Sequence, residues 1–130
     1  MAELNAAISL NAQSPEIYEE RGHTYNLLDE LDLALADFDR AIELGLAQPS
    51  TYFARGYASM FLGRLEDALS DFDKVVKLAP DFSGGYEGKA LVYTFMGRDS
   101  DAESEYNQAI ELGADRDQLI GLMESAKAQR

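Results

Sequence analysis

The 130-residue sequence contains no cysteine and no tryptophan, and His23 is its one histidine. Without cysteine the chain can form no disulfide, no thiolate zinc site and no thiol nucleophile. No stretch approaches the roughly 20 consecutive apolar residues of a membrane-spanning helix, and residues 1–5 have neither the basic region nor the apolar run of a secretory signal. We therefore expect a cytoplasmic protein that is not inserted in a membrane and takes no part in thiol chemistry.

Positive charge is also scarce, with 11 lysines and arginines against 24 acidic residues and a formal net charge of -13. A field of that sign repels phosphate backbones and anionic lipid surfaces, so we expect no nucleic-acid partner. The charge favours a basic or neutral protein partner, or it serves solubility alone. Apolar residues make up 46% of the chain and charged residues 27%, which is typical of a folded domain. We expect one domain over residues 1–130.

A periodicity of 34 residues runs through the sequence. Three columns are identical at this spacing, namely Tyr18, Tyr52 and Tyr86; Ala34, Ala68 and Ala102; and Leu44, Leu78 and Leu112. Two further columns keep a small residue or a ring, namely Gly22, Gly56 and Ala90; and Phe38, Phe72 and Tyr106. This spacing is the length of a helix-turn-helix repeat. The small column allows the two helices of a unit to approach closely, and the rings fill the space between successive units.

Within each copy the apolar spacing is helical. In the first copy, apolar residues recur at three- and four-residue steps: Leu31, Ala34, Phe38, Ala41 and Ile42. The pattern predicts a first helix near 15–28, 49–62 and 83–96, each followed by a second helix near 31–44, 65–78 and 99–112. No segment shows the alternation that a strand requires.

Residues that start and stop helices fall where this arrangement needs them. Pro15 and Pro49 suit the first turn of a helix, and Gly63 and Gly97 suit a left-handed stop between paired helices. Ser100, followed three residues later by a glutamate, predicts a capping box at the start of the last second helix.

The pattern resembles the tetratricopeptide repeat family. The family's residues are matched in the first copy by Tyr18, Gly22, Tyr25, Ala34, Phe38 and Ala41; in the second by Tyr52, Gly56, Ala68, Phe72 and Pro80; and in the third by Tyr86, Ala90, Tyr93, Ala102, Tyr106 and Ala109. Leu46 and Ala114 replace the proline that the family places between units. The resemblance implies an all-α fold of helix-turn-helix repeats stacked as a right-handed superhelical solenoid.

The same resemblance implies how the chain is divided. Residues 15–48, 49–82 and 83–116 correspond to three repeats. Residues 1–14 match the second helix of a preceding half repeat, and residues 117–130 correspond to a C-terminal capping helix.

In this family the first helices line a concave groove that binds other proteins. Carried over to this sequence, the groove residues are His23, Leu27, Phe53, Tyr57, Met60, Phe61, Leu91 and Phe95, with Glu16, Glu19 and Glu87 at its rim. The resemblance therefore implies a non-catalytic scaffold that binds a peptide or an amphipathic, partly basic helix of a partner protein. In the alternative interpretation, Phe61 and Phe95 turn into the core or under the next unit.

The same positions bear on two other functions. One subclass of the family grips C-terminal carboxylates with lysines and asparagines, but the matching positions hold Glu19, His23, Ala54, Gly84 and Gly88, which disfavours an acidic chaperone tail as ligand. The second is a homo-oligomer in which copies stack through exposed repeat ends, since a half repeat leaves an open edge.

The sequence offers no constellation that predicts catalysis, a cofactor or a metal. His23 has no nucleophile in a repeating position beside it. The aspartates around Asp37 lack the loop spacing and central glycine of a calcium-binding loop. Gly84, Gly85 and Gly88 lack the preceding strand of a phosphate-binding loop, and we expect them to loosen the first helix of the third unit.

One polar pair of columns also repeats. Cations and anions recur together sixteen residues apart, as Arg21 and Asp37, Arg55 and Asp71, and Lys89 and Glu105. We hypothesise ion pairs between the two helices of a unit or between neighbouring units. The alternative is that both groups simply reach solvent.

Overall fold

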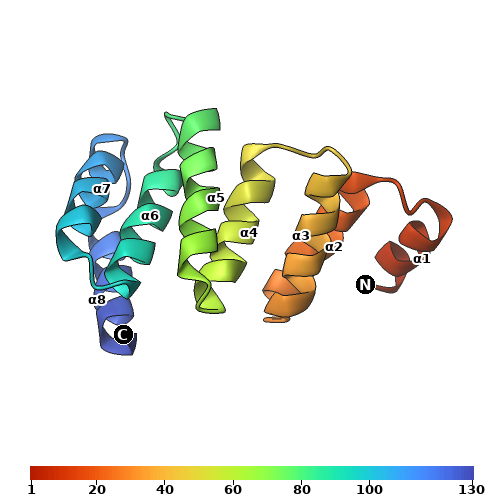
Figure 1. Cartoon of the computed structure of the whole chain (residues 1–130), viewed down its shortest axis with the longest axis horizontal. Helices are drawn as coiled ribbons and strands as arrows, with labels where there is room; N and C mark the ends of the chain where they lie inside the picture. The colour runs from red at the N-terminus through yellow and green to blue at the C-terminus, as the bar shows by residue number, and fades with distance from the viewer.

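The computed structural model describes all 130 residues. It contains eight α-helices, joined by short turns and loops, and no strand. The helices are α1 (Ala2–Leu10), α2 (Pro15–Leu27), α3 (Leu31–Glu43), α4 (Pro49–Phe61), α5 (Leu65–Leu78), α6 (Ser83–Phe95), α7 (Asp99–Glu111) and α8 (Arg116–Gln129). Helices α1 to α7 follow one another in chain order along the molecule, and α8 turns back to lie beside α6 (Figure 1). The all-α fold of stacked helical repeats is confirmed. None of the eight helices is long and apolar enough to cross a lipid bilayer.

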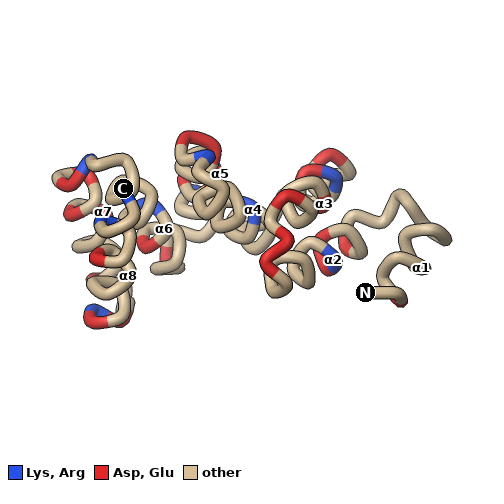
Figure 2. Tube along the Cα trace, turned by 90° about the horizontal axis from the view of Figure 1, so that it is seen from below, with Lys and Arg blue, Asp and Glu red and all other residues tan.

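The helices pair in the way the periodicity predicts. α2 packs on α3, α4 on α5, and α6 on α7, and each second helix then packs on the first helix of the next pair. The bounds of these six helices agree with the predicted ranges to within one residue. Seen from below, α2, α4 and α6 lie on one side of the stack and α3, α5 and α7 on the other (Figure 2). We call the former side the first-helix face.

Two phenylalanines and the small residues around them form the centre of the packing. Phe38 and Phe72 are fully buried. A Cβ atom added to Gly22 would lie 2.8 Å from the Phe38 ring, and one added to Gly88, in the next repeat, would lie 2.5 Å from the Phe72 ring. Each ring therefore packs against glycine because a side chain there would overlap it, and the Phe72 ring also reaches the following repeat. The predicted roles of the small and ring columns are confirmed for the rings of the first two repeats, whereas Tyr106 of the third is only partly buried.

The predicted helix ends are partly confirmed. Gly63 and Gly97 have φ values of 79° and 77°, the left-handed conformation that stops a helix. Asp29 has φ 59° in the same place of the first repeat. The capping box at Ser100 is wrong, because α7 begins at Asp99 and has no side-chain cap. The predicted start at residue 99 is correct, but the N-cap is Arg98, so Ser100 already lies inside the first turn of the helix.

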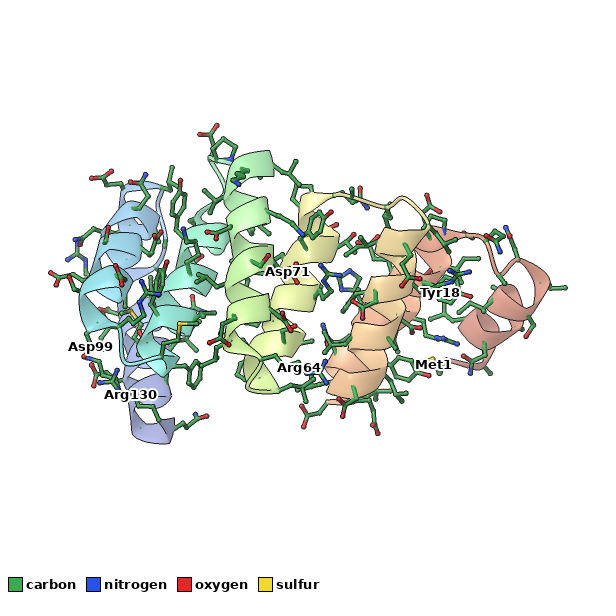
Figure 3. All side chains as sticks on the ribbon, viewed as in Figure 1. Met1, Tyr18, Arg64, Asp71, Asp99 and Arg130 are labelled. Atoms are coloured by element: carbon green, nitrogen blue, oxygen red, sulfur yellow. The ribbon has the colours of Figure 1, made fainter.

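The C-terminal helix α8 departs from the regular stacking. It packs chiefly on α6 and hardly touches α7, whereas α4 and α6 pack closely on the second helix before them. Arg130, which follows the end of α8, donates hydrogen bonds from Nη1 to the Thr94 carbonyl oxygen at 2.9 Å and to Asp99 Oδ1 at 2.7 Å. Figure 3 shows Arg130 and Asp99 next to each other at this end of the molecule. The two contacts fix the end of α8 to the junction between α6 and α7.

Candidate functional site

A line of aromatic rings runs along α4. Phe53, Tyr57 and Phe61 are four residues apart and therefore share one face of the helix. The ring centroids of Phe53 and Tyr57 are 5.0 Å apart, and those of Tyr57 and Phe61 are 5.9 Å apart. Phe82, which precedes α6, extends the line with its centroid 5.4 Å from that of Phe53. We call Phe82, Phe53, Tyr57 and Phe61 the aromatic strip.

The core holds the middle of this strip in place. Phe53 and Tyr57 each meet the ring of the buried Phe72 edge to face, at centroid distances of 5.8 Å and 5.7 Å. Phe61, at the end of the strip, is 58% exposed, and Leu27, its equivalent on α2, is 88% exposed. The strip thus has a rigid base and an apolar end open to solvent.

A cleft of about 430 Å³ separates α2 from α4 beside the strip. It is lined by His23, Asn26, Asp29, Leu31, Phe53, Ala54, Tyr57, Ala58 and Phe61, most of them apolar. We call it the α2–α4 cleft. Its volume lies within the range of sites that bind small ligands or single side chains. It brings together four of the predicted groove residues, namely His23, Phe53, Tyr57 and Phe61.

The polar groups of the cleft lie on α2 and its C-terminal turn. His23 is half exposed, with Nε2 3.6 Å from Glu19 Oε1 and its ring edge-on to Phe38 at a centroid distance of 5.2 Å. Asn26 Oδ1 is buried and has no hydrogen-bond partner. Asp29 is exposed at the turn that follows. No lysine or arginine lines the cleft.

The Tyr57 hydroxyl is influenced by its burial and by a charge in the third repeat. Burial raises the pKa of the Tyr57 hydroxyl above its ordinary value, and the negative charge of Glu87 on α6 raises it further. Both effects disfavour the phenolate. The ring therefore stays neutral at physiological pH and serves as a packing surface with one polar end.

Other predicted groove residues lie in the core, which corrects the prediction that they line an open groove. Met60 is 3% exposed and Leu91 is 4% exposed, and both belong to the apolar cluster around Phe72. Phe95 is half buried and packs against the same cluster. Adjacent first helices press together here, so the open part of the first-helix face is confined to the first two repeats.

The three rim residues differ from one another. Glu16 is exposed, and Glu87 accepts a hydrogen bond from the Ser83 hydroxyl at 3.2 Å. Glu19, in contrast, is engaged with the start of α4, because its carboxylate accepts hydrogen bonds from Gln48, Ser50 and Thr51 at 3.2, 3.0 and 2.8 Å. Glu19 therefore joins the first two repeats at the start of α4.

The hypothesised ion pairs are present within every repeat. The contact between Arg55 and Asp71 is bidentate, with Nε and Nη2 donating to the two carboxylate oxygens at 2.8 Å. Arg21 binds Asp37 in the same way at 2.7 Å. The Lys89 ammonium lies 3.2 Å from Glu105. The hydrogen bonds that Arg55 donates to Asp71 are the main cause that raises the pKa of Arg55, against the opposing effect of burial.

Each cation also reaches back to the preceding second helix, a contact that sequence reasoning missed. The acceptors are Asn5 for Arg21, Asp39 for Arg55 and Asp73 for Lys89, at 2.9, 3.0 and 2.9 Å. These acceptors are themselves 34 residues apart, so the signal was present in the periodicity. The pairs stabilise the stack, and none of their cations lines the cleft. No three histidine, aspartate or glutamate side chains lie together as metal ligands would.

Paired helices repeated in register, with a cleft on the first-helix face, define a helical repeat protein. Two family models described as tetratricopeptide repeat match residues 15–44 and 49–82. The chain belongs to the tetratricopeptide repeat family, a family of protein-interaction modules. A search of curated protein sequences gave no match.

Solved structures of similar fold include several repeat domains. A structure titled "MamA MSR-1 C2" has 25% sequence identity and a TM-score of 0.78 over 84% of this chain, and this chain covers 63% of that one, less than two thirds of its length. The first TPR of Spaghetti (RPAP3), bound to the HSP90 peptide SRMEEVD, has 17% identity and a TM-score of 0.77, with 92% of this chain and 94% of that chain covered. The Arabidopsis OM64 TPR domain has 17% identity and a TM-score of 0.78, with 90% and 97% covered. At 17% identity the likeness shows the fold alone.

Proposed function

We propose that this protein is a non-catalytic scaffold that binds a peptide or short helix of a partner protein along the aromatic strip and in the α2–α4 cleft. The observation that carries the proposal is the exposure of Leu27 and Phe61 at 88% and 58%, beside rings that the core holds rigid. Clustered exposed apolar side chains next to a cleft are typical of interaction sites, where rigid aromatic anchors supply most of the binding free energy.

The partner we propose is neutral or basic. The net charge of -13 attracts cations, and the carboxylate-gripping residues of one family subclass are replaced here by Glu19, His23, Ala54, Gly84 and Gly88. The acidic peptide bound by the RPAP3 domain is therefore a poor model for the ligand of this chain. An amphipathic segment with apolar anchors and basic flanks matches both the strip and the charge.

The proposal is tested by selecting binding peptides from a displayed random library and measuring their dissociation constants. We expect affinity to fall at least about tenfold in the double variant Leu27→Ala, Phe61→Ala, because two exposed anchors are lost. The matched control is Leu33→Ala, Leu78→Ala, which truncates two leucines of the second helices that are 47% and 53% exposed. Equal losses in both double variants, or no loss in the first, would place the binding surface elsewhere.

Self-association through the repeat ends is the second candidate. It is favoured by Ile120 and Leu122 of α8, each 42% exposed, and by the slight contact between α8 and α7. Tyr106 is only partly buried, whereas the equivalent Phe38 and Phe72 are covered by a following repeat. Sedimentation equilibrium over a wide concentration range decides this point: a rising mass that Leu122→Asp abolishes supports self-association, and a constant monomer mass excludes it.

A further inference from the structure

We propose that a cavity between α3 and α5 binds a phenol-type aromatic ring, either as the tyrosine side chain of a partner protein or as a free small molecule. The cavity has a volume of about 250 Å³. Its walls include Leu35, Asp39, Arg55, Ser59, Arg64 and Asp67. None of its lining residues belongs to the α2–α4 cleft, so this inference goes beyond the proposed function.

The cavity lies where the second repeat lacks a tyrosine. Tyr25, Ser59 and Tyr93 are 34 residues apart and occupy the same position on α2, α4 and α6. The second repeat therefore has a serine where the first and third have a phenol ring, and this serine lines the cavity. A smaller side chain leaves unfilled volume unless its neighbours move in. We interpret the cavity as the space of the missing ring.

The third repeat shows how the ring is held when it is present. The Arg98 guanidinium lies over the Tyr93 ring, with Cζ 4.7 Å from the ring centroid, and Arg98 Nε donates a hydrogen bond to Asp101 at 2.8 Å. The equivalents of this cation and acid one repeat earlier are Arg64 and Asp67, and both line the cavity. The second repeat thus retains the groups that accompany the tyrosine and lacks only the ring.

Arg64 is free to stack on a ring that enters from solvent. It lies at the start of α5, on the side of α3 (Figure 3), and its Nη2 approaches Asp32 Oδ1 only to 3.9 Å, a weak pair. The side chains of Arg64 and Asp39 are each 56% exposed, so this part of the cavity wall is open to a ligand. A guanidinium group on an aromatic face attracts the ring electrostatically.

The size and polarity of the cavity select a phenol. A protein cavity of about 150 Å³ is large enough to bind benzene, so this one accommodates a ring with a hydroxyl group. Leu35, which is 6% exposed, offers an apolar surface, and the carboxylates of Asp39 and Asp67 can accept the hydroxyl hydrogen bond. A ligand carboxylate would be repelled by these two acids, and a ligand cation by Arg55 and Arg64.

The test is a two-dimensional NMR titration of the isotopically labelled full chain with phenol, cyclohexanol and N-acetyl-tyrosine methylamide. Cyclohexanol has a hydroxyl group and a similar size but no aromatic face. We expect phenol to shift the backbone amide of Ser59 and the Nε–H signal of Arg64, with saturation at millimolar concentration. Cyclohexanol is expected to bind at least about twofold more weakly, because the stacking on Arg64 is lost.

The tyrosine derivative distinguishes the two sources of the ring. Both sources contain the same phenol group, but a side chain of a partner protein must enter with its backbone attached. Saturable shifts at Ser59 and Arg64 with N-acetyl-tyrosine methylamide support a partner's tyrosine as the ligand. Saturation with phenol alone supports a free small molecule.

Three variants assign the binding to this cavity. Ser59→Tyr places the ring of the other repeats inside it, so we expect this variant to lose the phenol-induced shifts and to unfold at a higher temperature than the native chain. Ser59→Ala is the matched control, which keeps the cavity open and is expected to bind phenol as the native chain does. Arg64→Ala is expected to weaken phenol binding by about twofold or more.

Several results would overturn the proposal without touching the proposed function. They are the absence of saturable shifts with phenol, equal binding of phenol and cyclohexanol, and phenol binding that is unchanged in Ser59→Tyr. Should Ser59→Tyr not fold, unchanged phenol binding in Arg64→Ala overturns it. The proposed function is judged separately, by the effect of Leu27→Ala, Phe61→Ala on the library-selected peptides.

Discussion

At the scale of single residues, a ladder of cations links the repeats. Arg21, Arg55 and Lys89 each bridge an acid of their own repeat and an acceptor of the preceding second helix. The acids Asp37 and Asp71 are almost fully buried, and Figure 3 shows Asp71 facing α4 from α5. A buried carboxylate requires its partner, so these pairs fix the distance and angle between the helices that they join.

The first prediction concerns the pair between Arg55 and Asp71. We expect Arg55→Met and Asp71→Leu each to lower the free energy of unfolding by about 3 kcal/mol, because each leaves a partly buried charge unpaired. The double variant should lose less than the sum, by about 0.5–3 kcal/mol. The control is the exposed pair Arg40 and Glu43, 3.4 Å apart, for which a coupling of at most about 0.5 kcal/mol is expected. Additive losses at Arg55 and Asp71 in urea unfolding would contradict the structural role.

The second prediction concerns Tyr57 at alkaline pH. Its folded-state pKa is raised by burial and by Glu87, so the folded protein holds the phenolic proton more tightly than the unfolded chain. The stabilisation that comes from the neutral Tyr57 hydroxyl is therefore complete below the unfolded-state pKa of about 10. It is lost as the pH rises from there through the folded-state pKa. Subtracting the tyrosinate absorbance titration of Tyr57→Phe from that of the native chain isolates this residue. A midpoint at or below about 10 would contradict the burial of the Tyr57 ring against Phe72.

At the scale of helices, α6 shows what its glycines contribute. The sequence suggested that Gly84, Gly85 and Gly88 loosen this helix, but all three are buried. A Cβ atom on Gly85 would meet Val76 Cγ2 at 3.0 Å, and one on Gly88 would meet the Phe72 ring. The glycines allow α6 to lie close against α5, a role that depends on neighbours in space and is therefore absent from local propensity.

The third prediction uses two glycines of opposite expected effect. Gly88→Ala places a Cβ 2.5 Å from a fully buried ring, so an overpacking cost of about 1–3 kcal/mol should outweigh the gain in helix propensity of about 1 kcal/mol. Gly121→Ala in α8 meets nothing within 4 Å, so we expect it to stabilise the protein by about 0.5–1 kcal/mol. Urea denaturation of both variants checks the signs. A stabilising Gly88→Ala would show that α6 is not closely packed on α5.

The helices were largely predictable from the sequence because their signals are local. The 34-residue period, Pro15 and Pro49 at helix starts, and Gly63 and Gly97 at helix stops set six helices to within one residue. The way α8 packs was not predictable, since it depends on contacts such as that of Arg130 with Thr94, which no periodic column contains. The capping box at Ser100 was placed two residues too late, because the N-cap of α7 is Arg98.

The candidate site was predictable only in part. The repeat register located the exposed Leu27 and Phe61, but it could not distinguish them from Met60 and Leu91, which adjacent helices cover. Exposure at these positions depends on how closely neighbouring first helices approach, and that distance varies along the stack. The engagement of Glu19 with the start of α4 was likewise invisible, because its partners are about thirty residues away.

At the scale of the whole molecule, the residues that join the repeats are different from those that we propose to bind a partner. The cation ladder and the ring-on-glycine packing join the repeats into one row (Figure 1), and the first-helix face presents the aromatic strip and the cleft. The net charge of -13 acts over the whole surface and favours approach of a basic segment. Specificity is then expected from a few side chains of the first two repeats, with the third repeat serving mainly as core.

The most direct test of this account is NMR mapping of a library-selected peptide on the full chain, recorded as chemical-shift changes at every backbone and side-chain amide. The account predicts that the largest changes cluster on α2 and α4, around Asn26, Leu27 and Phe61, and are absent around Leu78 on α5. Changes centred on the second helices, or at the chain end around Leu122, would contradict it.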